Sequence, residues 1–499
     1  MDSETPNGTA NGKTNISALA RHYLMRYWGL IVLLLWGSAI LALNLVRLDP
    51  YGIDEAAARG LILVWAIGDR VLNPLVTLGI PDFRILLFLP LGFYWPGSIV
   101  AAKVFTMLLA FAAVTLLYRW CRRTTDSETA QIACALLLIF PLFLNQIDAI
   151  GAGIYLLLMF TVAEWLDRRY RKIQRPLGGW FFMQLLWTAI VITIHPMGLA
   201  YPLALAWHWN KSPLDRKQQT YMYVGLALVV VVVLGIRGGW EFATWLGNPL
   251  LPLAQAYQAV THVTGEPNWL VATLFAITAG ALLLFDRRFL LNDFLGSVLL
   301  GAILLGLLAA DGAWALLVVT LVFTRGTYYL IRINEAWGGY GLLRKRGLLL
   351  AMLFLVATTA MLSDKARYLA IRENQLSQQD LLIRALAQDA ADNDLVLSVA
   401  SQWPGRTMLA TRQDTFPLPP AAGKDSEAFL ASIKNITHLV FDPGDPANQA
   451  LAQQLANLTH RTKTVLLNSG GVVIAVLEPE GSEDKEDKAG PPGDTGSGS

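Results

Sequence analysis

Charged side chains are scarce in this sequence, at 15% of its 499 residues, whereas hydrophobic side chains make up 54%. Soluble domains are usually about one quarter charged, so the composition indicates a polytopic membrane protein. No segment combines clustered basic residues with interleaved aromatic residues, and we therefore expect no nucleic-acid partner. The net charge of +2 favours no other class of partner.

Cysteine is almost absent as well. Cys121 and Cys134 are the two cysteines, and neither falls in the polar C-terminal region, which excludes a disulfide framework there. The sequence also lacks a P-loop, a GxGxxG motif between a strand and a helix, an HExxH motif and paired CxxC motifs. These absences argue against a nucleotide-driven pump, a zinc protease and a redox enzyme.

Apolar segments long enough to cross a bilayer recur along the chain. With ~20 mostly apolar residues needed for each helix, we expect about eleven spans, of which the sixth is short enough to be a half-helix. They cover approximately residues 27–46, 99–118, 128–145, 149–166, 178–195, 197–209, 219–236, 268–285, 293–310, 312–331 and 347–363.

The basic residues fall in alternate connections between these spans. Arg122 and Arg123 follow the second span, and Arg168 and Arg169 follow the fourth, whereas the short connection around Asp148 has no basic residue. Because cytoplasmic loops are enriched in Lys and Arg, this pattern predicts a cytoplasmic N-terminus and a C-terminus on the outer side of the membrane.

The predicted fold class is a polytopic α-helical membrane protein with a small C-terminal α/β domain outside the cytoplasm. In that domain, periodicity predicts helices at 375–390, 426–433 and 447–458, and strands at 395–399, 438–441, 464–467 and 471–477. The expected division is a disordered and basic cytosolic tail at 1–26, a transmembrane domain at 27–364 with outer loops at 47–98 and 237–267, the α/β domain at 365–480, and a disordered tail at 481–499.

Two acidic sites stand on the predicted outer side. Asp54 and Glu55 are adjacent in the first outer loop, followed by a helix-prone stretch, 56–67, that we expect to lie along the membrane interface. Such a pair can deprotonate a nucleophile or hold a cation, or it can simply mark a loop that leaves the membrane. Asp148 occupies a tight turn after the third span, where it could face the same cavity or act as the N-cap of the fourth span.

Three basic side chains near the outer ends of spans are candidates for phosphate binding. Lys103 lies about one turn inside the second span, where a cation needs a partner or must extend to the interface. His195 ends the fifth span and is equally compatible with a structural role. Arg237 follows the seventh span and could instead be an interfacial anchor.

The order and sidedness of four short motifs resemble the GT-C superfamily of membrane glycosyltransferases. These motifs are Asp54-Glu55, Leu89-Pro90-Leu91, Asn145 to Asp148, and Thr193 to Gly198. Within the superfamily, the chain is most similar to the protein O-mannosyltransferase-like branch that includes the lipid A aminoarabinose transferases. The resemblance covers about residues 25–365 and does not extend to the C-terminal domain. Two departures are His195, where the family usually has lysine, and Ala56-Ala57-Ala58, where an aromatic residue is common.

This resemblance implies transfer of a sugar from a polyprenyl-phosphate carrier to a lipid, glycan or protein acceptor, at the outer face of a bacterial inner membrane. It requires no particular cofactor, and a divalent metal, held by Asp54 and Asp148, is possible. The roles that it implies are Asp54 as the general base, Glu55 and Asp148 as residues that shape the site or hold a metal, and Lys103, His195 and Arg237 as ligands of the donor phosphate.

Two other classes of function stay open. A non-catalytic scaffold or assembly subunit of a cell-envelope complex would keep the fold and carry an apolar patch on residues 365–480. A transporter or lipid flippase would need polar residues along a path through the membrane, and the apolar segments contain few of them.

Overall fold

The computed structural model describes residues 49–68, 84–170, 178–211, 214–236, 269–306, 312–338, 376–421, 426–458 and 461–477, and parts of 30–38. These residues form two compact units. The first contains the described residues of 1–46 and 104–369, and the second contains those of 47–103 and 370–499. The domain boundary predicted at residue 364 assigned the loop at 47–98 to the transmembrane domain. In the structure the described residues of this loop belong to the same unit as the C-terminal domain.

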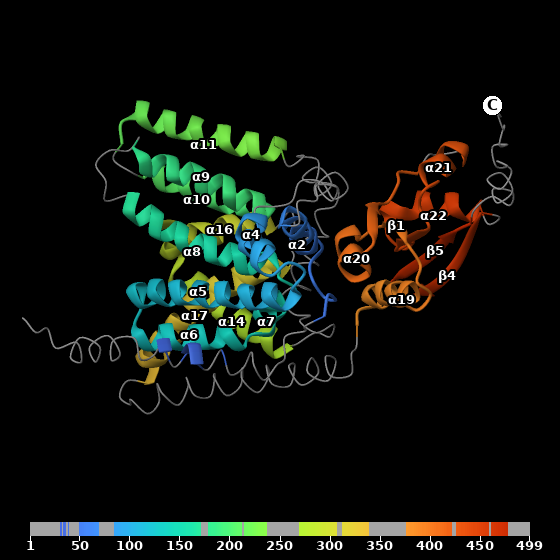
Figure 1. The fold of residues 1–499 in the computed structure, drawn as a ribbon. Helices are drawn as coiled ribbons and strands as arrows, with labels where there is room; N and C mark the ends of the chain where they lie inside the picture. Colours follow the sequence, from blue (N-terminus) through green and yellow to red (C-terminus); the bar gives the residue numbers. More distant parts are fainter. Residues whose placement is uncertain are drawn as a thin grey trace, which may run out of the picture. The chain divides into compact units, whose positions relative to one another are not determined.

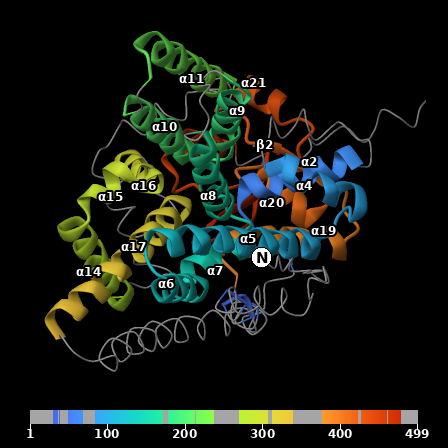
Figure 2. The same cartoon turned by 90° about the vertical axis from the view of Figure 1, so that its left-hand side faces the viewer.

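The described part of the first unit consists of helices (Figures 1 and 2). Helix α14 packs against α17, α10 packs against α16, and α9 packs against α11. Helix α5 begins in the second unit and continues through the first. The helices are α5 (Ile99–Thr124), α6 (Ser127–Ile139), α7 (Pro141–Asp148), α8 (Ala152–Tyr170), α9 (Gly179–Ile194), η1 (Pro196–Leu199), α10 (Ala200–Asn210), α11 (Arg216–Ile236), α14 (Trp269–Phe285), α15 (Arg287–Asn292), α16 (Phe294–Gly306) and α17 (Gly312–Gly338).

Among the described residues, α5, α11 and residues 312–332 of α17 are long and apolar enough to cross a membrane. Helices α7 and α8, bent by 106° at their junction, make a fourth crossing if they count as one broken span. The structure therefore has helices where the sequence predicts spans at 99–118, 219–236 and 312–331. The span expected at 347–363 and most of the span expected at 27–46 lie outside the described residues. The count of eleven and the orientation stay predictions.

The third expected span, 128–145, differs from the prediction because it is two helices. Phe140 is extended, with φ −71° and ψ 124°, and Pro141 occupies the first turn of α7. Proline has no N–H to donate and fits the first helical turn, so it ends one helix and begins the next. An apolar run of sufficient length cannot reveal such a break by itself.

The C-terminal domain in the second unit contains a five-stranded mixed sheet with strand order β2-β1-β3-β5-β4. Strand β1 is parallel to both β2 and β3, while β5 is antiparallel to both β3 and β4. The elements are α19 (Gln378–Asp392), β1 (Ser398–Ser401), α20 (Pro404–Thr411), β2 (Asp414–Pro417), α21 (Ser426–Ser432), β3 (His438–Phe441), η2 (Pro446–Asn448), α22 (Gln449–Ala456), β4 (Thr462–Asn468) and β5 (Gly471–Val476).

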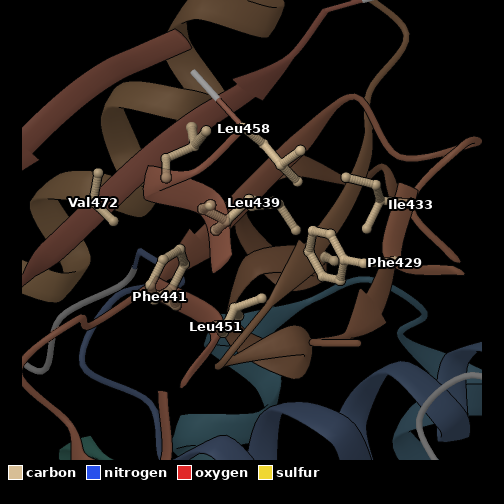
Figure 3. Close-up of a cluster of buried hydrophobic side chains, with 10 residues drawn as sticks. Phe429, Ile433, Leu439, Phe441, Leu451, Leu458 and Val472 are labelled. Atoms are coloured by element: carbon tan, nitrogen blue, oxygen red, sulfur yellow. The ribbon is translucent and has the colours of Figure 1, made fainter. Parts of the chain in front are cut away.

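Alternating side chains of the central strands enter two separate apolar layers, as the two-residue period of a strand requires. On one face, Leu439 and Phe441 pack with Phe429 of α21 and Leu451 of α22 (Figure 3). On the other face, Val440 packs in a layer that α19 covers with Leu382 and Leu386. The domain therefore has its own hydrophobic core.

Most of the elements predicted for this domain are present. The strand at 438–441 matches β3, and the strand pair around Asn468-Ser469-Gly470 matches β4 and β5. The predicted strand at 395–399 begins later, at Ser398. Helix α20 and strand β2 were not predicted, because Pro404-Gly405 and the proline-rich residues after Phe416 have the composition of a loop.

The second unit also contains two helices from the first outer loop, α2 (Glu55–Gly68) and α4 (Arg84–Tyr94). Helix α2 packs against both α4 and α20 (Figures 1 and 2). Residues 57, 58 and 60–66 are buried, so protein surrounds most of this helix. The helix predicted at 56–67 is thus present, but its apolar side chains face other parts of the protein instead of lying open along the membrane interface.

A pH dependence follows from His438 on β3. Burial lowers the pKa of this histidine, although Asp389 opposes the shift. The unfolded chain takes up the proton near pH 6.5, whereas the folded chain takes it up at lower pH. The stabilising contribution is therefore complete above about pH 6.5 and is lost as the pH falls through the folded-state pKa. We expect the urea midpoint of the C-terminal domain, followed by pulse proteolysis of the full-length protein, to fall more steeply toward pH 5 in the wild type than in His438→Gln. Parallel curves would contradict this assignment.

Candidate active site

The first outer loop turns sharply before α2. Gly52 adopts a φ of 74°, which glycine reaches without steric cost, and the Tyr51 N–H donates to Asp49 Oδ1 at 3.3 Å. Burial raises the pKa of Tyr51 above its usual value, although Arg384 opposes the shift. The turn brings the chain to Asp54, whose carbonyl accepts the first helical hydrogen bond, from the Ala58 N–H at 2.9 Å.

The Asp54 carboxylate is paired with a buried arginine. Arg84 Nη2 lies 3.1 Å from Asp54 Oδ2, and the side chains are 2% and 42% exposed, respectively. A buried guanidinium requires such a partner because its desolvation is costly. The arginine comes from the first residue of α4, which packs beside α2. The pair therefore fixes one side of a carboxylate whose other side is open to solvent or substrate.

Glu55, the neighbouring acid, faces different partners. Its Oε1 accepts hydrogen bonds from Arg59 Nε at 2.7 Å and from the Gly405 N–H at 2.8 Å. Its Oε2 accepts from the Arg406 N–H at 3.0 Å. Both oxygens of Glu55 thus bind donors, two of which belong to the first turn of α20 in the C-terminal domain.

Lys103 belongs to the second unit and is 1% exposed. A lysine that extended to water at the membrane surface would keep its ammonium group exposed, so this side chain does not reach the interface in that way. A buried ammonium must be balanced by polar or charged groups.

The candidates in the first unit occupy helix ends. Asp148 is the last residue of α7. Helix α8 begins four residues later, at Ala152, and at its start Gln146 Oε1 accepts the Gly153 N–H at 3.1 Å. His195 connects α9 to η1, where its Nδ1 accepts the Met197 N–H at 3.2 Å. One ring nitrogen of His195 therefore has a structural role.

The structure brings Asp54, Glu55 and Arg84 together within one unit. Asp148 and His195 belong to the other unit, and Arg237 lies outside the described residues. Arg84 was missed in the sequence. The available signal was a single arginine immediately before the apolar run Ile85-Leu86-Leu87, where a cation must find a partner.

A metal centre was the other chemistry left open by the sequence. Within the described ranges, no three or more His, Cys, Asp or Glu side chains gather in a group able to hold a metal ion. The described carboxylates of Asp54 and Glu55 bind Arg84, Arg59 and the start of α20 instead. These residues alone do not make a metal site.

Sequence comparisons find no matching family model and no matching curated protein. Among solved structures, the apo form of ArnT from Cupriavidus metallidurans is similar with a TM-score of 0.50 and 16% identity, over 89% of this chain and 97% of that chain. The oligosaccharyltransferase of Archaeoglobus fulgidus, in complex with Zn and sulfate, has a TM-score of 0.51 and 14% identity, over 83% and 68% of the two chains. The form of ArnT bound to undecaprenyl phosphate has a TM-score of 0.49, 16% identity and the same coverage as the apo form.

ArnT is a lipid A aminoarabinose transferase, and both it and the oligosaccharyltransferase are members of the GT-C superfamily. The chain therefore has a GT-C fold, as the resemblance in its sequence implied. At this level of identity the likeness shows the fold.

A testable consequence concerns Arg412, which ends α20 in a left-handed conformation with φ 57° and ψ 24°. Its guanidinium lies 5.0 Å from the ring centre of Trp65 on α2. We expect Arg412→Ala to lose this contact, worth about 0.5–1 kcal/mol at an exposed site. Arg412→Gly loses the same contact but relieves a backbone cost of about 1 kcal/mol. Hydrogen exchange should therefore show α20 to be less protected in Arg412→Ala than in Arg412→Gly, and the reverse order would contradict this interpretation.

Proposed function

We propose that this protein is a membrane glycosyltransferase that moves a sugar from a polyprenyl-phosphate carrier to an acceptor outside the cytoplasm, with Asp54 as the general base. The observation that carries the proposal is the Asp54 carboxylate itself. It is partly exposed, it stands at the start of a buried helix in a chain with a GT-C fold, and the buried Arg84 fixes its direction.

In the proposed reaction, a hydroxyl or amine of the acceptor attacks the anomeric carbon of the donor sugar. Asp54 takes the proton of this nucleophile as the new bond to carbon forms. The bond between carbon and the phosphate oxygen breaks, and its electron pair leaves with the polyprenyl phosphate. Attack opposite the leaving group inverts the configuration of the sugar. The acceptor class, whether lipid, glycan or protein, is not specified by these residues.

The leaving phosphate needs positive charge in a site from which water is largely excluded. We assign this task to Lys103, His195 and Arg237, as the resemblance implies. Lys103 belongs to the same compact unit as Asp54. Arg84 is a further candidate, since its guanidinium already holds an anionic carboxylate at the same place. Asp148 would shape the site, and we route no step through a metal.

The proposed setting is a bacterial inner membrane, with the C-terminal domain in the periplasm. Helices α5, α11 and α17 support a membrane location. A polyprenyl carrier would reach the protein from the bilayer, and its phosphate would stand at the level of the headgroups. The predicted C-out orientation places Asp54 and the C-terminal domain on that outer side.

A non-catalytic scaffold is the second candidate function. The observation that favours it is apolar exposure on the C-terminal domain, where Val396 is 86% exposed and Leu467 is 68% exposed. Leu467 lies on β4, an edge strand of the sheet, and edge strands are frequent docking sites. A scaffold of this type would not depend on Asp54 chemistry.

The first test replaces the proposed base. Asp54→Asn keeps the size of the side chain and removes its ability to take a proton, so we expect release of polyprenyl phosphate from a polyprenyl-phosphate-sugar pool to fall at least about a hundredfold. Asp49→Asn is the matched control, because it changes an acid of the same loop. Equal release by wild type and Asp54→Asn would remove Asp54 from the mechanism, and no release by wild type with several donors would favour the scaffold.

A second test addresses the donor phosphate. Lys103→Met removes the buried ammonium, and we expect the KM for the donor to rise about tenfold or more, because one charge-assisted contact is lost. Lys103→Arg should retain most of the affinity. The control is Lys211→Met, since Lys211 is exposed and donates to the Leu291 carbonyl and to Asn292. An unchanged KM in Lys103→Met would exclude this lysine from donor binding.

A further inference from the structure

The C-terminal domain contacts the Asp54 loop through the first turn of α20. An α-helix leaves its first four N–H groups without helical partners, and the Glu55 carboxylate accepts two N–H groups at this end, those of Gly405 and Arg406. A negative charge at a helix N-terminus is also favoured by the helix dipole. Glu55 therefore acts as an external cap for α20, supplied by a residue 350 positions earlier in the chain.

The approach of the two helices requires glycine at position 405. A Cβ atom there would lie 2.7 Å from Arg59 Cγ and 2.9 Å from the Arg59 backbone nitrogen. Side-chain carbon atoms essentially never come this close to backbone, so a larger residue would push the first turn of α20 away from α2.

The other end of α20 is held against α2 as well. The Arg412 guanidinium lies over the Trp65 ring and donates from Nη2 to the Gly97 carbonyl at 3.2 Å. Contacts at Glu55 and Trp65 are ten residues apart on α2, so α20 is fixed along about 15 Å of that helix. A single contact would allow α20 to rotate relative to α2, whereas two separated contacts resist this rotation.

Helix α20 is in turn fixed within its own domain. The Ser401 hydroxyl, at the end of β1, is 2.8 Å from Thr407 Oγ1 and accepts the Trp403 N–H at 3.0 Å. Arg406 forms an ion pair with Asp380 of α19 and donates to Gln379 Oε1 at 3.3 Å. A displacement of α20 would therefore involve both the first turn of α2 and the rest of the C-terminal domain.

We propose that the C-terminal domain is a positioning element of the Asp54 site, with Glu55 as the positioning residue. Helix α20 holds the first turn of α2, and that turn sets the direction of the adjacent Asp54 carboxylate together with Arg84. The catalytic consequence rests on the function proposed for Asp54. Because a reacting group displaced by about 1 Å can lose a hundredfold in rate, the domain controls turnover without touching the substrate. Glu55 itself takes no part in proton transfer, since both of its oxygens accept other donors.

The test uses full-length protein in three variants. Glu55→Gln keeps the side-chain size but removes the charge and one acceptor oxygen, and Gly405→Ala introduces the close Cβ contact. Gly60→Ala is the matched control, because it is also a glycine substitution in this contact region, on α2, and a Cβ there has no atom within 4 Å. Hydrogen exchange of peptides covering 54–66 should rise about tenfold or more in Glu55→Gln and Gly405→Ala, and should not rise in Gly60→Ala, because alanine is favoured over glycine in a helix interior.

Activity provides the second measurement. We expect kcat for sugar transfer to fall at least about tenfold in Glu55→Gln and Gly405→Ala, with the donor KM unchanged, because the base is displaced while the phosphate ligands are not. Partial unfolding would also lower the apparent kcat at an unchanged KM, but it would speed hydrogen exchange throughout the C-terminal domain, whereas displacement of the base speeds it in the 54–66 peptides. Normal exchange at 54–66 in both variants, or faster exchange with an unchanged kcat, would overturn the positioning role. If wild type transfers no sugar, the proposed function fails, and the exchange data still decide whether α20 holds α2.

Discussion

The structure at the start of α2 depends on the groups that bind two adjacent carboxylates, those of Asp54 and Glu55. Asp54 is paired with Arg84 of α4, and Glu55 accepts the N–H groups at the start of α20. Each contact joins α2 to a different neighbour, so the acidic pair holds three helices in one arrangement. Removing the Asp54 carboxylate would take this anion away from the buried Arg84 guanidinium, which is more costly than losing a neutral contact. This requirement explains why a loop outside the membrane spans folds as part of a compact unit.

How much of this arrangement the sequence could predict depends on the range of the interactions. Asp54 and Glu55 were recognisable from their place after an apolar span, and β3, β4 and β5 from their residue pattern. The contacts of these two acids with their partners could not be recognised in the sequence, because Arg84 is 30 residues from Asp54 and Gly405 is 350 residues from Glu55. Helix α20 is short and begins with Pro404-Gly405, and a helix of this length depends on tertiary contacts more than on its own propensity.

The break between α6 and α7 illustrates the same limit in the first unit. Hydropathy over 128–145 satisfied the length criterion, yet the helix is interrupted at Phe140, where the backbone is extended before Pro141. A hydropathy window measures how apolar a segment is. It does not locate the residue at which the backbone hydrogen bonds of a helix are interrupted. Gln146 then caps α8 through the Gly153 N–H, a task that the sequence had offered to Asp148.

The geometry of a helix start gives the adjacent acids their separate roles. Asp54 precedes α2 and its carbonyl accepts the first helical hydrogen bond, whereas Glu55 is the first residue of the helix. The two side chains bind different partners, so one carboxylate can hold α20 while the other does not. Here Glu55 binds α20, which leaves Asp54 as the partly exposed carboxylate. With Asp54 as the proposed base, the pair combines a structural joint with the proposed reactive group, and the proposed positioning role makes the domain that Glu55 binds a part of the site without a group in the reaction.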